Sequence, residues 1–303
     1  MSPDIAASIH ARLLGPARAR GEVFDLTLAR YAAERFLYRL GASEARERCI
    51  LKGASLLSVW LAEPYRATRD IDLLASGRVD EPAIRALVTV VCEVPCPEDG
   101  LRFDTQALVV EDITAGQEYV GKRARLRAFL GKASIAIHID FGVGDAVGLA
   151  PETIEYPTLL PTLPPPSLRA YRREVSLAEK FHAMVDLDRR NSRMKDFHDA
   201  WALSELFAFD GRRLQIAVAA CFERRATGWT ASAPGALTSA FYEDEELASR
   251  WRRYLTSGAV RIPPPSHFSI VGDRVGRFFG PLRDCMVAGE TFDHAWPPGG
   301  PWR

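Results

Sequence analysis

The sequence lacks several features that define whole classes of protein. No apolar run reaches the length that crosses a membrane, and the N-terminal stretch MSPDIAASIHARLLG has no apolar core of the kind found in signal peptides. Cysteine is scarce: the five cysteines among 303 residues are odd in number and scattered, which indicates free thiols in a reducing compartment. We therefore expect a cytoplasmic protein with no membrane segment.

The chain also lacks a net charge, because 39 basic residues balance 39 acidic ones. A protein of this composition can bind nucleic acid only through local basic patches. Two segments qualify. Residues 121–134 hold five basic residues and no acidic one, and residues 169–195 hold eight basic residues and four acidic ones. Each segment could be a solvated face or a surface that contacts RNA phosphates.

Apolar periodicity predicts helices in the first part of the chain. Residues 1–48 favour helices, and Gly41 is placed to end one of them. A further helix is expected over residues 55–63, where Pro64 would stop it, and another over residues 81–94.

Strands are expected between and after these helices. Residues 70–74 predict one strand, and the stretches 101–113 and 122–130 could form a pair. The clearest strand is SIAIHIDFGVGD, residues 134–145, in which three isoleucines share one face and Asp140 lies on the opposite face.

The later part of the chain is predicted to be mostly helical. Residues 151–169 hold six prolines, which exclude a helix and a central strand, so we interpret them as a connector. The sequence SLAE then predicts a helix with Ser176 as its N-cap, and residues 294–303 indicate an irregular tail. We expect an α+β fold with a first domain over residues 1–160, containing N-terminal helices, and a mostly helical domain over residues 161–303.

Two aspartates in an apolar strand point to chemistry. Asp70 and Asp72 are separated by one residue, so both side chains lie on the same face of the strand. Like charges repel and are costly to bury, so a metal ion, a basic side chain or water should lie beside them. Nucleotidyl transfer needs two or three carboxylates that converge on Mg²⁺, and Asp140 could supply the third from a neighbouring strand.

A possible phosphate-binding turn precedes this strand. The sequence KGAS, residues 52–55, lies between a short apolar strand and a helix. The amides after Gly53 and the hydroxyl of Ser55 could meet a phosphate at the start of that helix. Gly53 taken alone would more often be an ordinary turn glycine.

These segments, in this order, resemble the AbiEii-type nucleotidyltransferases. Those proteins are the toxins of type IV toxin–antitoxin pairs and include the mycobacterial MenT enzymes. The stretches that carry the resemblance are LKGASLL followed by YRATRDIDLL, then EVSLAEKFHAMVD, and finally NSRMKDFHDAWAL. Together they span residues 51–203. The chain departs from many members at Ala54, where they have a second glycine or a Gly-Ser pair.

The resemblance implies a nucleotidyltransferase-like mixed sheet flanked by helices, with Mg²⁺ as cofactor and an NTP as substrate. The metal ligands that it implies are Asp70, Asp72 and Asp140. The nucleotide-binding residues that it implies are Lys52, Gly53, Ser55, Arg66 and Lys180. The catalytic residues that it implies are Asp70, Asp72, Lys180, Asp196 and Asp199, and the choice between the last two is open.

The implied reaction is the transfer of a nucleoside monophosphate to RNA, at the 3′ end of tRNA, by a toxin held in check by an antitoxin protein. Two alternatives stay open: a nucleotidyltransferase that modifies a small molecule or a protein side chain, and a non-catalytic RNA- or partner-binding protein of the same fold. Asp199 could also have only a structural role, because Lys195 could form an i,i+4 ion pair with it on the same helix. The retained carboxylates favour an enzyme.

Overall fold

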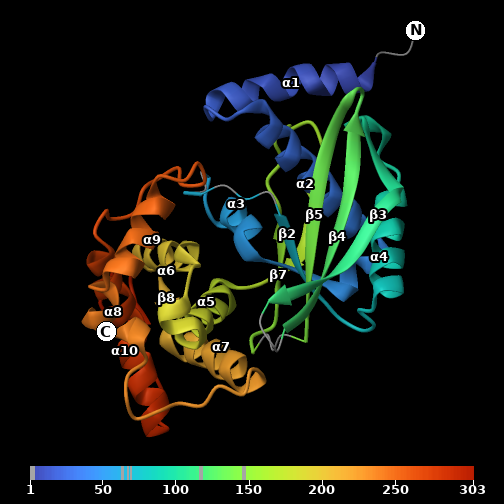
Figure 1. Ribbon diagram of the computed structural model, residues 1–303. Coiled ribbons are helices and arrows are strands. Elements are labelled where there is room, and N and C mark those ends of the chain that lie inside the picture. Colours follow the sequence, from blue (N-terminus) through green and yellow to red (C-terminus); the bar gives the residue numbers. More distant parts are fainter. Residues whose placement is uncertain (1–3, 63–64, 67, 69, 116–118, 145–147) are drawn as a thin grey trace. The chain divides into compact units, whose positions relative to one another are not determined.

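The computed structural model describes residues 4–62, 65–66, 68, 70–115, 119–144 and 148–303 (Figure 1). The chain divides into two compact units. Unit 1 comprises Met1–Pro64, Thr68–Gly144 and Pro151–Tyr171, and unit 2 comprises Tyr65–Ala67, Asp145–Ala150 and Arg172–Arg303. The strands after the first prolines belong to the sheet of unit 1, and the predicted domains over residues 1–160 and 161–303 stay a prediction.

A seven-stranded mixed sheet forms the centre of unit 1, in the order β3-β4-β5-β2-β1-β7-β6. Its strands are β1 (Cys49–Lys52), β2 (Asp70–Ala75), β3 (Leu101–Ala115), β4 (Tyr119–Leu130), β5 (Ala133–Val143), β6 (Glu152–Glu155) and β7 (Ser167–Ala170). Neighbouring strands are antiparallel except for two pairs, since β2 runs parallel to β5 and β1 runs parallel to β7. The predicted strands over residues 70–74, 101–113, 122–130 and 134–145 are confirmed within the described residues.

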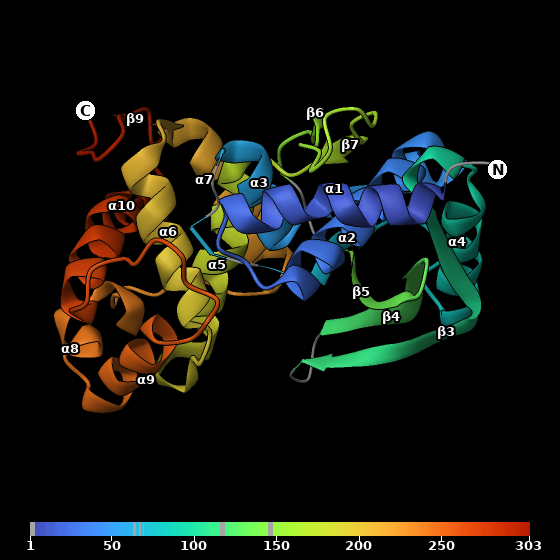
Figure 2. The same ribbon diagram turned by 90° about the horizontal axis from the view of Figure 1, so that it is seen from above.

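Helices cover one face of this sheet. The helices of unit 1 are α1 (Ile5–Ala19), α2 (Phe24–Ala42), α3 (Leu57–Trp60) and α4 (Glu81–Glu93). The helix α2 packs on β5 and β7, and α4 packs on β3 and β4 (Figures 1 and 2). Accordingly Ile135, Ile137 and Ile139 are buried, whereas Asp140 lies on the other face of β5. The apolar face is the core of unit 1, and the polar face carries the candidate site.

Two predictions about the helices of unit 1 were wrong. The helix α2 continues through Gly41 to Ala42, and a Cβ atom at Gly41 would lie 2.4 Å from the backbone oxygen of Ser167. Gly41 therefore allows the helix to pack closely on β7 instead of ending it. The helix expected over residues 55–63 is only the short α3, preceded by a 3₁₀ turn from Gly53 to Leu56, while Glu63 and Pro64 lie outside the described residues.

The proline-rich segment was predicted to contain no central strand, and this was wrong at its end. Its first part forms β6 at the edge of the sheet, where a strand tolerates nearby prolines. The strand β7 starts at Ser167, directly after the last proline of the segment, and lies between β1 and β6. No proline stands inside either strand, so the backbone donors needed for pairing are present.

Unit 2 is built from helices around an aromatic core. Its elements are α5 (Arg173–Leu187), α6 (Met194–Leu206), β8 (Phe209–Asp210), α7 (Gly211–Arg224), α8 (Ser239–Tyr242), α9 (Glu245–Leu255), α10 (Phe268–Ala288) and β9 (Ala295–Trp296). The ring of Phe181 stacks on Phe279 with centroids 4.2 Å apart, and Phe197 packs edge-on against Phe268. The mostly helical character predicted for this part is confirmed.

Two local predictions in unit 2 failed because tertiary contacts outweighed local signals. The helix α5 starts one turn earlier than expected, after Arg172, so Ser176 lies inside the helix and is not its N-cap. The expected irregular tail is folded back onto the unit. Its strand β9 pairs with β8, and the indole nitrogens of Trp296 and Trp302 donate hydrogen bonds to the backbone oxygens of Ser204 and Phe278.

Candidate active site

In unit 1 the turn at Gly53 lies directly against Asp72. Gly53 has a φ of 69°, a left-handed conformation that favours glycine. A Cβ atom at this position would lie 2.1 Å from Oδ2 of Asp72 and 2.6 Å from its Cγ. Only a residue without a side chain allows this approach. The buried Ser55 donates a hydrogen bond from its hydroxyl to the backbone oxygen of Asp70, 3.3 Å away, which ties the turn to the start of β2.

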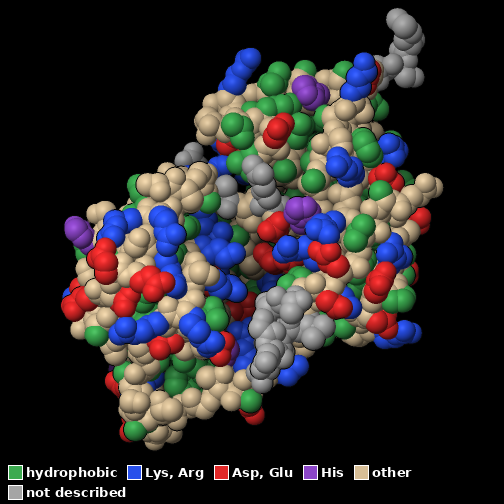
Figure 3. Space-filling model, in the orientation of Figure 1, with side chains coloured by type: hydrophobic (Ala, Val, Ile, Leu, Met, Phe, Trp, Pro, Cys, Tyr) green, Lys and Arg blue, Asp and Glu red, His purple; other side chains and the backbone are tan. Residues whose placement is uncertain are grey.

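A row of charged residues crosses the polar face of the sheet in register. Lys52 on β1 lies opposite Asp72 on β2, which is beside Asp140 on β5. Asp140 in turn lies opposite Arg123 on β4, and Arg123 lies opposite Glu111 on β3. Figure 3 shows acidic and basic side chains next to one another on this unit, with a histidine beside them. Two neighbouring positions of this row, Asp72 and Asp140, are therefore both carboxylates.

Asp140 is tied to an arginine. Its two carboxylate oxygens accept hydrogen bonds from Nε and Nη2 of Arg123, both at 2.6 Å. These hydrogen bonds raise the pKa of Arg123 above its ordinary value, so the guanidinium stays charged. In the neighbouring row, Nδ1 of His138 lies 3.5 Å from Oδ1 of Asp70. Asp140 thus lies on the strand beside Asp72, as predicted, but with a basic partner already in place.

The carboxylates of unit 1 fit a magnesium ion held by two of them. Among the described residues, no group of three or more histidines, cysteines, aspartates and glutamates is arranged to hold a metal ion. Mg²⁺ commonly uses one or two carboxylates, with water and substrate phosphates as its other ligands. Asp70 and Asp72 share one face of β2, as the two carboxylates of such a site would, and both oxygens of Asp140 are bound by Arg123.

The basic residues of segment 121–134 are largely paired within the sheet. Besides Arg123, Lys122 lies 2.6 Å from a carboxylate oxygen of Asp112, and Arg125 lies 2.5 Å from one of Glu111. Arg127 donates a hydrogen bond to the hydroxyl of Ser134 at 2.8 Å. The segment is therefore less basic toward solvent than its sequence suggests, because neighbouring strands supply the missing acids.

In unit 2 a buried lysine lies between two aspartates of the next helix. Nζ of Lys180 on α5 lies 2.8 Å from Oδ2 of Asp199 and 3.7 Å from Oδ1 of Asp196, both on α6. Both carboxylates are buried, and the side chain of Lys180 is 11% exposed. The three residues that the sequence singled out here do come together.

Asp199 accepts hydrogen bonds from three side chains. The hydroxyl of Tyr65 donates to Oδ1 at 3.0 Å, and Arg66 donates from Nε and Nη2 to the two oxygens, both at 2.7 Å. Lys180 binds Oδ2 as well. Burial alone would raise the pKa of Asp199, but Arg66 and Lys180 outweigh it and hold that pKa far below its ordinary value. Lys195 is not among the partners of Asp199 in the described part of the chain, so the expected i,i+4 ion pair does not form.

Asp196 differs from Asp199 although it lies less than one turn away. Its Oδ2 accepts a hydrogen bond from Nε of Arg193 at 2.6 Å. Its Oδ1 is buried and has no hydrogen-bond partner among the described residues, with Lys180 as the nearby cation. One carboxylate oxygen of Asp196 therefore accepts no hydrogen bond, whereas both oxygens of Asp199 do.

The comparisons with known proteins identify the family of the chain. A family model described as "Nucleotidyl transferase AbiEii toxin, Type IV TA system" matches residues 35–272, which is most of the chain. The chain belongs to the AbiEii family. It is therefore a nucleotidyltransferase of a toxin family, for which an NTP is the substrate and an antitoxin is the expected partner.

Two solved structures are similar to this AbiEii protein. A candidate nucleotidyltransferase from H. pylori has 13% identity and a TM-score of 0.50, over 86% of this chain and 96% of that one. The protein JHP933 from Helicobacter pylori has 12% identity and a TM-score of 0.48, over 84% and 90% of the two chains. At this identity the first structure supports the fold alone. No curated protein matches the chain. None of the described helices combines the length and apolarity needed to span a membrane.

Two histidines of this AbiEii protein belong to the core of unit 2. Nε2 of His182 is hydrogen-bonded to the hydroxyl of Thr227 at 2.7 Å, and Nδ1 of His198 to that of Tyr254 at 2.8 Å. Burial lowers the pKa of each imidazole to about 4, so both rings are neutral at pH 7.

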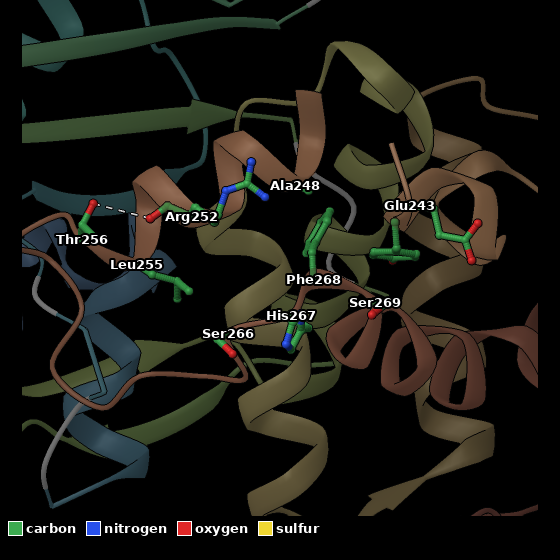
Figure 4. Close-up of a pocket in the computed structure, with 10 residues that line it drawn as sticks. Glu243, Ala248, Arg252, Leu255, Thr256, Ser266, His267, Phe268 and Ser269 are labelled. Carbon is green, nitrogen blue, oxygen red and sulfur yellow. Dashed lines mark hydrogen bonds between the residues drawn. The ribbon is translucent and has the colours of Figure 1, made fainter. Parts of the chain in front are cut away.

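A pocket of about 550 Å³ lies in unit 2, at α9 and the start of α10 (Figure 4). Arg252, Leu255 and Thr256 line it from α9 and its C-terminal end, and His267 and Phe268 line it from the start of α10. None of the residues predicted from the sequence lines this pocket. The site residues predicted from the sequence thus lie in two places, the polar face of unit 1 and the Lys180 cluster of unit 2, and each is described by itself.

Sequence reasoning missed the partners of the predicted residues. Arg123 could have been found, because it alternates with apolar residues on a strand that pairs with the strand of Asp140. Tyr65 and Arg66 are more than 130 residues away from Asp199 in the sequence, so no motif could have predicted that they contact it. Arg66 was predicted to bind nucleotide, but the structure places its guanidinium on Asp199.

Proposed function

We propose that this protein catalyses the Mg²⁺-dependent transfer of a nucleoside monophosphate from an NTP to the 3′ end of tRNA, with release of pyrophosphate. The observation that carries the proposal is the close approach of Gly53 to Asp72, 2.1 Å from an added Cβ atom. This contact brings the turn that would bind phosphate against one carboxylate of the Asp70–Asp72 pair, and metal-dependent phosphoryl chemistry needs carboxylates beside the phosphates.

In the reaction, the oxygen of the acceptor hydroxyl attacks the α-phosphorus of the NTP. The bond from that phosphorus to the bridging oxygen breaks, pyrophosphate departs with the electron pair, and the hydroxyl proton is lost. Asp70 and Asp72 would hold Mg²⁺, which supplies positive charge to the phosphate oxygens when bound. Asp140 remains a weaker candidate for a third ligand, because Arg123 occupies both of its oxygens.

The triphosphate would be bound by backbone and basic groups. The amides that follow Gly53 and the hydroxyl of Ser55 would contact its oxygens, and Lys52 lies beside Asp72 on the next strand. Lys180 would place a point charge where negative charge builds on the departing pyrophosphate. Its cluster supports this role, since Arg66, Lys180 and Arg193 carry three positive charges and Asp196 and Asp199 only two negative ones.

RNA is the proposed acceptor because the family suggests it and because basic groups remain for its phosphates. Two basic residues of segment 121–134, Arg127 and the exposed Lys132, have no carboxylate partner anywhere in the described part of the chain. Lys195 is likewise exposed on unit 2. Phosphate contacts of this kind give affinity without sequence specificity, so the choice of tRNA would depend on other contacts.

The acceptor is tested with purified protein, total tRNA, Mg²⁺ and each α-labelled NTP in turn. The proposal predicts that label enters tRNA with one NTP preferred. It also predicts that tRNA with a periodate-oxidised 3′ ribose takes up no label, because its terminal hydroxyls are gone. Equal labelling of oxidised tRNA would contradict transfer to the 3′ end. Label that enters only protein or a small molecule would overturn the RNA assignment and retain the enzyme class.

A further inference from the structure

We propose that Asp199 is a positioning residue, which fixes Lys180 and the segment Tyr65–Arg66, and that it is not a metal ligand or a proton carrier. The inference builds on the proposed function, since it concerns the residues that would meet the triphosphate. It rests on the number and burial of the contacts that Asp199 makes.

The hydrogen-bonding capacity of the Asp199 carboxylate is committed to protein groups. One oxygen accepts from Tyr65 and Arg66, and the other accepts from Arg66 and Lys180, at distances from 2.7 to 3.0 Å. The side chain is 1% exposed and Arg66 is 7% exposed. A group that binds a metal or takes a proton must offer an oxygen to it, and neither oxygen of Asp199 is offered.

The same contacts anchor a short segment from the first part of the chain in unit 2. The backbone oxygen of Tyr65 accepts hydrogen bonds from the amides of Arg261 and Ile262, at 2.9 and 3.1 Å. The ring of Tyr65 lies 4.6 Å from that of His198, centroid to centroid. Arg66 is followed four residues later by Asp70. We call the contacts among Tyr65, Arg66 and Asp199 the Asp199 clamp, and it fixes the chain shortly before the metal-binding strand.

Asp196 provides the contrast that makes the assignment specific. It is equally buried and lies on the same helix, yet its Oδ1 has no hydrogen-bond partner among the described residues, and it does not touch Tyr65 or Arg66. If one of the two aspartates acts on the ligand, the unsatisfied one has the free acceptor. Asp199 then serves the reaction by positioning Lys180, and the clamp holds the segment Tyr65–Arg66 in the fold of unit 2.

The clamp is tested by hydrogen exchange at the amides of Arg261 and Ile262 in the full-length protein. Asp199→Asn removes the charge that binds Arg66, so exchange at these two amides should rise at least tenfold. Asp196→Asn is the matched control, because it removes a buried charge on the same helix without touching the clamp. Unchanged exchange in Asp199→Asn, or an equal rise in both variants, would overturn the clamp.

A variant that unfolds would raise exchange everywhere, so a milder change is included. Tyr65→Phe removes only the hydroxyl that donates to Asp199 and should raise exchange at Arg261 and Ile262 with the rest of the protein unaffected. Asp199→Glu keeps the charge and should restore part of the protection. If Tyr65→Phe exchanges like wild type, the hydroxyl contributes nothing to the clamp and the assignment fails.

Kinetics separate positioning from direct participation. If Asp199 acts through Lys180, the double variant Lys180→Ala/Asp199→Asn should lose no more than about threefold beyond Lys180→Ala alone, since residues that act as a unit are not additive. Losses that multiply would show an independent role for Asp199 and overturn the proposal. If wild type transfers no nucleotide at all, the proposed function fails, and the exchange experiment still decides the clamp.

Discussion

Gly53 and Asp72 show how a single residue shapes the site of unit 1. The left-handed backbone at Gly53 and the contact with the Asp72 carboxylate each require glycine, for independent reasons. Glycine at this position of the motif therefore has a physical cause, because only glycine lets the backbone of the turn lie against the Asp72 carboxylate. The neighbouring Ala54 does not have a positive φ, so alanine in place of the glycine found there in many family members is compatible with the turn.

Gly53→Ala should disturb both the backbone and Asp72. We expect the free energy of unfolding to fall by about 2 kcal/mol, since the backbone conformation is strained and the new methyl group displaces the carboxylate. NTP- and Mg²⁺-dependent thermal stabilisation should be lost. Urea denaturation and thermal shifts measure the two effects.

The control for this substitution is Gly276→Ala in α10. Nothing lies within 4 Å of a Cβ atom there, so the variant should be neutral or more stable by up to about 1 kcal/mol. Retained ligand stabilisation in Gly53→Ala would show that the turn does not serve the carboxylates.

At the scale of elements, α2 holds the proline-rich segment by a buried ion pair. Glu34 and Arg35 lie 2.8 Å apart and are both buried. Glu34 accepts a hydrogen bond from the amide of Leu159 at 2.6 Å, and Arg35 donates one to the backbone oxygen of Pro164 at 2.9 Å. These two residues therefore hold the part of the segment between β6 and β7 on α2.

The stability of unit 1 should depend on pH through Glu34. Burial raises the pKa of Glu34 from 4.5 to about 7, with Arg35 offsetting part of the effect. Because the folded pKa is the higher one, the contribution to stability is fully present below pH 4.5 and is lost as the pH rises through 7. This loss amounts to about 3 kcal/mol. Glu34→Gln cannot ionise, so its free energy of unfolding relative to wild type should rise between pH 5 and pH 8. A constant difference across that range would contradict the assignment.

The sequence could predict those helices and strands whose pattern of apolar and polar residues lies within the element itself. The alternation of apolar and polar residues in β5 follows from one buried face, and the polar face then places Asp140 beside Asp72. The failures share a cause in tertiary contacts. Gly41 is needed by a strand more than a hundred residues later, and the tail after α10 is ordered by Trp296 and Trp302 packing on unit 2.

The pairings of the candidate site residues could not be predicted from the sequence. Spacing and resemblance singled out Asp70, Asp72, Lys180, Asp196 and Asp199, and their roles stay a prediction. The partners that decide their roles come from distant parts of the chain, as Arg123 does for Asp140 and Arg66 for Asp199. Charge alone could not assign these partners, because the sequence offers 39 basic residues.

At the scale of the whole molecule, the proposed chemistry draws on both units. The carboxylate pair belongs to unit 1 and Lys180 to unit 2, while the family match extends over residues 35–272 and so includes both. Neither unit contains all of the residues that the proposal assigns to the reaction. The activity should therefore fail when either contribution is removed, although each variant keeps its fold.

The most direct measurement is transfer of α-labelled nucleotide by Asp72→Asn and Lys180→Ala, beside wild type and the control Asp112→Asn. Asp112 is an exposed aspartate of the same sheet, paired with Lys122. The account predicts that each of the two site variants loses at least about 10²–10³ in rate, and that growth arrest on expression disappears with it. Asp112→Asn should remain active and toxic, and all variants should keep the circular dichroism of wild type. An Asp72→Asn variant as active and as toxic as wild type would contradict the central claim, since the carboxylate pair would then be only a solvated part of the strand.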